Sequence, residues 1–111
     1  MRMRIIVIMF AALALPATVL AAPKANAAAG KQVYHAHCSM CHGADGQGNP
    51  SLAKMLHATI PPLSSKQVQG MSDSQIRETI EKGKGKMPAV KGLSSSDIDN
   101  VIAFVRTLAK K

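Results

Sequence analysis

Hydrophobic residues are distributed unevenly along the 111-residue chain. An unbroken apolar run covers residues 5–15, and beyond it apolar positions recur every three or four residues, as in helices with one buried face. This spacing predicts helices over residues 28–37, 52–56, 72–82 and 95–109. No segment alternates between apolar and polar residues for more than a few positions, so we predict an all-α fold.

Two of the predicted helices carry clear start signals. Ser72 followed by Gln75 fits a capping box, and Gly83 provides a stop after that helix. Ser94 precedes the last helix, which has Asp97 in its first turn. The positions expected in the core are Ile76, Ile80, Ile98, Val101, Ile102, Val105 and Leu108, with Phe104 on the flank.

The N-terminal segment has the pattern of a secretory signal peptide. Arg2 and Arg4 precede the apolar run, Pro16 ends it, and small residues follow. The run is short for spanning a bilayer, and no later stretch is apolar enough to do so. We therefore predict a signal peptide over residues 1–22 and one exported domain over residues 23–111, with an uncleaved membrane anchor as the alternative.

The net charge of the chain limits the classes of binding partner, and its few aromatic residues indicate that the domain binds a cofactor. The chain carries a net charge of +8, and +6 remains once Arg2 and Arg4 are removed. This charge suits an acidic protein surface or an anionic membrane more than nucleic acid, because no nucleic-acid-binding motif is present. Tyr34 and Phe104 are the aromatic residues that remain in the domain, so its core needs another large apolar body.

Both cysteines of the chain lie in the pentapeptide CSMCH, residues 38–42. A C-x-x-C pair followed directly by His is typical of covalent haem attachment. Residues three apart on a helical turn project to one side, so Cys38 and Cys41 can form thioethers with the two vinyl groups of a porphyrin. The adjacent His42 then reaches the iron as an axial ligand. We predict one covalently bound haem c.

Two other interpretations of the cysteine pair are possible. A thioredoxin-like thiol site belongs to a fold with a central sheet, and a zinc site needs a second pair of ligands. No sheet is predicted, and no further cysteine exists. Haem attachment is therefore the favoured interpretation, and a secreted thiol or metal-binding protein is the alternative.

The second axial ligand must come from another part of the chain. Met87 lies in the glycine-rich segment 83–90, where glycines permit a close approach to the ring and Pro88 stiffens the backbone. A thioether is a soft, neutral ligand that favours Fe(II) and raises the reduction potential. We predict Met87 as this ligand, with His57 and then Met55 in reserve.

These motifs together resemble a class I cytochrome c over residues 28–108. The resemblance rests on CSMCH, on the later Lys-Met-Pro, and on flanking helices that carry Gly30, Tyr34 and Phe104. It implies about four short helices wrapped around one haem, with the first and last helices crossing at those three residues. The short middle region is more similar to small bacterial or photosynthetic carriers than to the mitochondrial type.

The resemblance also implies a partner for the histidine ligand. In the family a proline carbonyl beyond the haem loop accepts the Nδ1–H hydrogen bond of this histidine. In this chain that carbonyl belongs to Pro61 or Pro62, which places Pro62 in the expected haem pocket.

With His42 and Met87 both bound, the iron has no open position for a substrate, so we predict a non-enzymatic electron carrier. The expected protein is a soluble periplasmic monomer that shuttles single electrons between redox partners. A haem subunit docked to a larger dehydrogenase or oxidase is the alternative.

Four lysines flank the predicted methionine ligand in the sequence. They are Lys82, Lys84, Lys86 and Lys91. A positive rim of this kind steers an acidic partner surface towards the haem edge. A solvated loop kept soluble by its lysines is the alternative.

Overall fold

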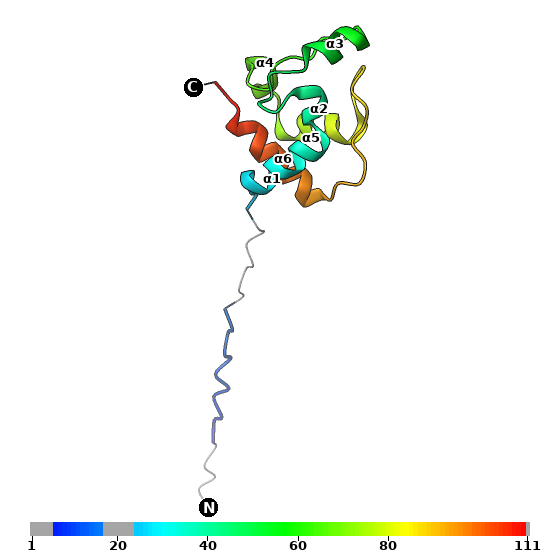
Figure 1. The fold of residues 1–111 in the computed structure, drawn as a ribbon. Coiled ribbons are helices and arrows are strands. Elements are labelled where there is room, and N and C mark those ends of the chain that lie inside the picture. The colour runs from blue at the N-terminus through cyan, green and yellow to red at the C-terminus, as the bar shows by residue number, and fades with distance from the viewer. Residues whose placement is uncertain (1–5, 17–23, 111) are drawn as a thin grey trace, which may run out of the picture.

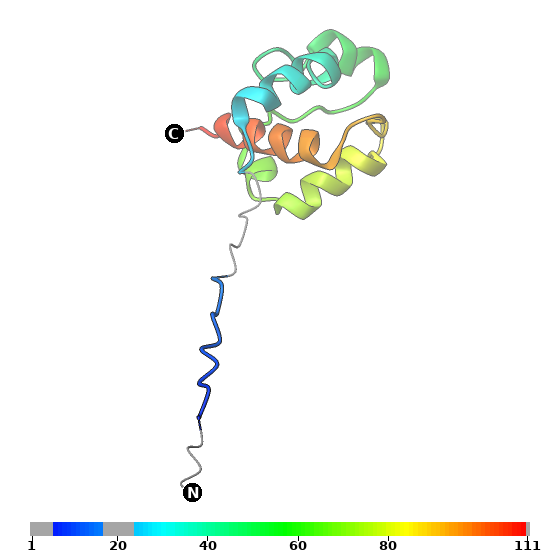
Figure 2. The same ribbon diagram turned by 90° about the horizontal axis from the view of Figure 1, so that it is seen from below.

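The structure is a computed structural model that describes residues 6–16 and 24–110. Residues 6–16 form neither helix nor strand, and their side chains are exposed. The rest of the described chain folds into a helical body (Figures 1 and 2). The predicted signal-peptide cleavage after residue 22 lies outside the described residues.

Six helices follow one another in the described part of the chain. They are α1 (Ala27–His37), α2 (Ser39–His42), α3 (Pro50–Leu56), α4 (Lys66–Gln69), α5 (Asp73–Lys82) and α6 (Ser95–Thr107). Residues 6–16 and 24–110 contain no strand, which confirms the predicted all-α fold there. Within the same residues, no helix is long and apolar enough to cross a bilayer.

The four predicted helices are confirmed as α1, α3, α5 and α6, and the one-turn helices α2 and α4 are additional. Helix α3 begins two residues before the predicted start at residue 52. Asn49 caps it, with its side chain accepting from the Leu52 N–H, and Ser51 lies inside the helix. The helix ends because His57 takes a left-handed conformation, with φ of 50°, well before Pro61.

Both predicted start signals on the later helices are confirmed, and both are complete capping boxes. The Ser72 side chain accepts from the Gln75 backbone N–H, and the Gln75 side chain accepts from the Ser72 N–H. Ser94 and Asp97 make the same reciprocal pair at the start of α6. Each box satisfies two backbone donors that a helix start leaves without partners.

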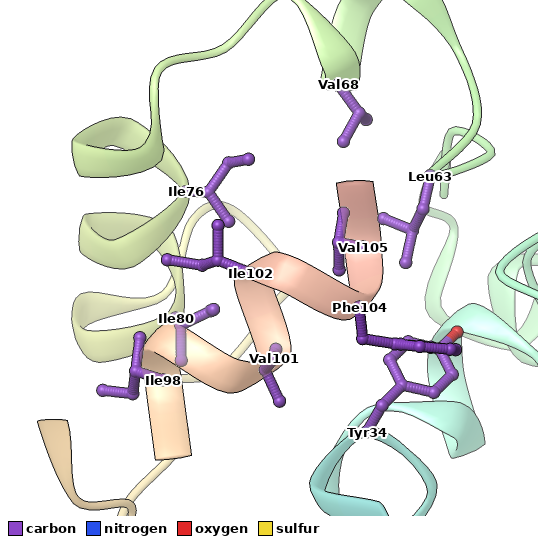
Figure 3. Packing of buried hydrophobic residues seen from close by; sticks show 10 residues of the cluster. All are labelled: Tyr34, Leu63, Val68, Ile76, Ile80, Ile98, Val101, Ile102, Phe104 and Val105. Atoms are coloured by element: carbon purple, nitrogen blue, oxygen red, sulfur yellow. The ribbon is translucent and has the colours of Figure 1, made fainter. Parts of the chain in front are cut away.

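The core lies on both sides of α6, which is placed between α1 and α5 (Figure 3). On the α1 side, the rings of Tyr34 and Phe104 pack at 5.0 Å between centroids, and the expected crossing with buried Gly30 is confirmed. The buried hydrophobic residues are Tyr34, Leu63, Val68, Ile76, Ile80, Ile98, Val101, Ile102, Phe104 and Val105. Leu108, expected with them, is half-buried at the end of α6.

Candidate haem site

The CSMCH segment forms a helical turn that continues the direction set by α1. Cys38 caps α1 by donating its N–H to the Tyr34 carbonyl at 2.8 Å, and the His42 N–H donates to the Cys38 carbonyl at 3.0 Å. The Ser39 hydroxyl also donates to the His35 carbonyl at 2.8 Å. Cys38 and Cys41 are free, half-buried thiols three positions apart on this turn, as the spacing predicts.

The environment of Cys38 does not suit thiol chemistry at neutral pH. Burial, followed by the neighbouring Cys41, raises the pKa of the Cys38 thiol to about 11. Thiol–disulfide exchange depends on a thiolate, and catalytic cysteines have a lowered pKa. The structure therefore argues against Cys38 as the reactive thiolate of a thiol redox site.

The His42 imidazole is half-buried, and burial lowers its pKa, which favours the neutral form that ligates metals. Its Nδ1 atom is buried and has no hydrogen-bond partner, the one such side-chain atom in residues 6–16 and 24–110. Such an atom costs about 1–3 kcal/mol when left unpaired. Two free thiols three positions apart and an adjacent imidazole in its neutral form are the donor set that covalent attachment and ligation of a haem require.

The hydrogen bond expected from His42 to the carbonyl of Pro61 or Pro62 is not formed in this structure. Nδ1 has no partner, and the Pro62 carbonyl instead accepts from the Ser65 N–H at 3.0 Å. Pro62 begins the turn that leads into α4, and this turn directs its carbonyl towards the Ser65 N–H.

The loop after the motif folds back onto it. The Gly48 N–H donates to the His42 carbonyl at 2.6 Å, and the Asn49 N–H donates to the Cys41 carbonyl at 3.0 Å. The Asn49 side-chain amide also donates to the Met40 carbonyl at 2.9 Å. Sequence reasoning missed this role of Asn49, although an Asn followed by Pro50 is a helix-start signal that points to the residue.

Met87 lies in the loop between α5 and α6 and is half-buried. Its backbone forms a tight turn with Lys84, in which each N–H donates to the other's carbonyl at 2.9 Å. A side chain at Gly83 would place its β-carbon 2.5 Å from the Met87 carbonyl oxygen, so this turn requires glycine there. The reserve ligands His57 and Met55 are both exposed.

A groove of about 480 Å³ runs along α5 to the start of the Met87 turn. Its lining includes Met71, Gln75, Thr79 and Gly83, and it includes neither Met87 nor any residue of the CSMCH motif. The groove is therefore not the place where the predicted site residues meet.

Known proteins match both the sequence and the fold. The profile of a family described as cytochrome c oxidase, cbb3-type, subunit III, matches residues 25–105. The chain belongs to the c-type cytochromes. Cytochrome c-554(547) of Halothiobacillus neapolitanus is 34% identical over 75% of this chain and 97% of its own length. Cytochrome c6 of Leptolyngbya boryana is 38% identical over 78% of this chain and 98% of its own length.

A solved structure described as the KustC0563 c-type cytochrome superposes with a TM-score of 0.61 at 28% identity. The match covers 73% of this cytochrome and 98% of that chain. The chain is therefore a small monohaem class I c-type cytochrome of electron transport, with one covalently bound haem c. This confirms the predicted family, fold and cofactor.

Proposed function

We propose that this cytochrome is an exported, soluble, monomeric carrier that passes single electrons between redox protein partners and is not an enzyme. The observation that carries the proposal is the half-buried His42 imidazole, whose lowered pKa favours the neutral form, beside two free thiols on one helical turn. When bound, haem c supplies a one-electron Fe(II)/Fe(III) couple.

The residues have separate roles in this proposal. Cys38 and Cys41 hold the haem covalently, and His42 is the first axial ligand, kept neutral by its burial. Met87 is the second ligand, on a turn that Gly83 allows to close tightly. Two protein ligands leave no position for a substrate, which favours electron transfer over catalysis.

Export to the periplasm follows from the proposed signal peptide over residues 1–22, leaving the domain at residues 23–111. The structure supports cleavage ahead of Asn26, because this residue caps α1 and donates its N–H to the Asn100 side chain at 2.8 Å. Cleavage after Ala22 keeps both interactions, whereas cleavage after Ala27 removes them. The mass of the secreted protein measures the cleavage site directly.

Haem ligation is tested by producing the chain with a c-type maturation system and measuring its intact mass and its absorption spectra. We expect one haem that survives denaturation and a low-spin spectrum that is lost in Met87→Ala. Met55→Ala is the matched control, because Met55 is exposed and its loss should leave the spectrum unchanged. A low-spin spectrum that persists in Met87→Ala would rule out Met87 as the ligand.

We propose that the redox partner presents an acidic surface, because Lys84, Lys86 and Lys91 are exposed around the Met87 turn. Lys82 is instead paired with Glu78 at 3.3 Å. If these lysines steer the encounter, Lys84→Glu with Lys86→Glu slows reduction by the partner, and added salt slows the wild type. Lys31→Glu with Lys66→Glu, an equal charge change at exposed positions of α1 and α4, is the control. Equal rates in all three proteins would contradict steering.

A second candidate function is a haem subunit docked to a larger complex. It is supported by the matching family profile and by a relative named cbb3-type cytochrome c oxidase subunit CcoP, from Azospirillum brasilense. That relative is 36% identical, and this chain matches 29% of its length. A purified protein that sediments as a monomer and reacts with partners by collision supports the carrier, whereas co-purification in a large complex supports the subunit.

A further inference from the structure

Tyr34 is fully buried where α1 and α6 cross. Its ring packs against Phe104 (Figure 3). The His35 ring lies in an edge-to-face arrangement with it, at 5.9 Å between ring centroids. Its hydroxyl donates to the carbonyl of Gly43 at 2.5 Å. Gly43 directly follows His42, so this bond joins the core of the helical body to the peptide next to the proposed ligand.

Packing alone does not account for a tyrosine at this position. A phenylalanine ring fills the same space, and a buried hydroxyl is unfavourable unless it is hydrogen-bonded. The Tyr34 carbonyl also accepts from the Cys38 N–H at 2.8 Å. Tyr34 therefore contacts the backbone at both ends of the CSMCH motif, through its carbonyl at Cys38, the first residue of the motif, and through its hydroxyl at Gly43, directly after it.

Backbone hydrogen bonds within the loop also lie close to Gly43. The Gly46 N–H donates to the Gly43 carbonyl at 3.2 Å, and the Gly48 N–H donates to the His42 carbonyl at 2.6 Å. The acceptor carbonyls of both bonds, those of Gly43 and His42, are positioned by the backbone conformation at Gly43. The Tyr34 hydroxyl is the side-chain group from α1 that holds it.

We propose that the Tyr34 hydroxyl is a positioning group that fixes the Gly43 peptide and, through it, the direction of the His42 imidazole. This rests on the proposed role of His42 as an iron ligand. Burial raises the pKa of the Tyr34 phenol to about 12, so the hydroxyl remains a hydrogen-bond donor at neutral pH.

The first test compares Tyr34→Phe with Ile102→Val in the haem-bearing protein. Ile102→Val removes one buried methyl group on the α5 side of α6 and leaves the hydroxyl in place. Amide hydrogen exchange is measured at Gly48, which reports the loop, and at Val90, whose N–H donates to the Ile80 carbonyl at 2.8 Å. Exchange at Val90 reports opening of the rest of the fold.

We expect Tyr34→Phe to speed exchange at Gly48 about three- to tenfold more than at Val90, as loss of one hydrogen bond predicts. Ile102→Val should speed both amides by the same factor. Equal acceleration at Gly48 and Val90 in Tyr34→Phe would show that the hydroxyl does not hold the loop and would overturn the proposal.

The second test measures the proton shifts of the haem methyl groups in the oxidised protein, because these shifts depend on the plane of the axial imidazole. They should change in Tyr34→Phe and stay unchanged in Ile102→Val. Faster exchange at Gly48 with unchanged methyl shifts would overturn the positioning role. A low-spin spectrum retained in His42→Gly would instead contradict the proposed ligand, which separates the two failures.

Discussion

Gly30 on α1 lies so close to Asn100 on α6 that a β-carbon at position 30 would stand 1.8 Å from the Asn100 carbonyl oxygen. The same β-carbon would be 2.9 Å from the Val101 backbone nitrogen. Both neighbours are backbone atoms of a helix, which cannot move aside as a flexible side chain can. The crossing of α1 and α6, which places Tyr34 and hence the CSMCH turn, therefore requires glycine at position 30.

We predict that Gly30→Ala lowers the free energy of unfolding by about 1–3 kcal/mol, because the helices must separate. Helix propensity by itself favours alanine by about 1 kcal/mol, so the sign of the change identifies the cause. Urea unfolding measures the effect. Ala28→Gly, on the exposed side of α1, is the control and should lose about 1 kcal/mol through propensity alone. A more stable Gly30→Ala variant would contradict the close crossing.

Asn26 links the start of α1 to α6. Its side chain accepts from the Ala29 N–H at 3.1 Å, which caps the helix. We expect Asn26→Ala to lower the free energy of unfolding by about 1 kcal/mol, whereas Asn26→Asp, which retains the acceptor, should lose much less. Equal losses in the two variants, measured by urea unfolding, would show that the cap contributes nothing.

The features predicted best from the sequence are those that depend on residues close together along the chain. The helices α5 and α6 were found because their capping serines and apolar stripes are local patterns. The CSMCH motif was found for the same reason, since three residues on one turn define its chemistry. The helices α2 and α4 have four residues each, which is too short for a periodic signal.

What the sequence did not predict depends on the path of the chain through space. The Tyr34 hydroxyl bond joins residues nine positions apart, and whether they meet depends on the turn between them. The hydrogen bond expected from the His42 Nδ1–H to the Pro61 or Pro62 carbonyl is not formed in this structure, and whether those groups meet also depends on the chain between them. The resemblance to a family indicated a proline carbonyl as the partner of His42, whereas the backbone of the turn pairs the Pro62 carbonyl with the Ser65 N–H.

His57 is the one non-glycine residue with a left-handed backbone in residues 6–16 and 24–110. That conformation is unfavourable for a residue with a β-carbon, so His57→Gly should raise the free energy of unfolding by about 1 kcal/mol. His57→Ala, which keeps the unfavourable conformation, should give no such gain. Both variants should keep the wild-type haem spectrum, and a changed spectrum in both would show that His57 ligates the iron.

Arg106 on α6 holds the turn between α4 and α5. Its guanidinium donates to the carbonyl oxygens of Gln69 at 2.8 Å and Met71 at 2.6 Å, and to the Asp73 carboxylate at 2.8 Å. We expect Arg106→Ala to lower the free energy of unfolding by about 2 kcal/mol, mainly through the lost carbonyl bonds.

Asp73→Asn is the matched variant for this ion pair. The Asp73 side chain is 72% exposed, so solvent screens the pair, and its loss should cost less than about 1 kcal/mol. Urea unfolding of both variants at low and high salt measures the two contributions. A loss in Asp73→Asn as large as in Arg106→Ala would mean that the ion pair, and not the carbonyl bonds, provides the stability.

Tyr34 should make stability fall at alkaline pH. Burial raises its pKa from 10.0 to about 12, so the unfolded chain loses the phenol proton at lower pH than the folded protein does. The stabilisation is complete below pH 10 and is lost as the pH rises to 12, with a slope of at most about 1.4 kcal/mol per pH unit. Tyr34→Phe lacks this group, so a comparison of the two proteins isolates its contribution. The stability advantage of the wild type over Tyr34→Phe should therefore shrink between pH 10 and 12 in urea unfolding, and a constant difference would contradict a buried phenol.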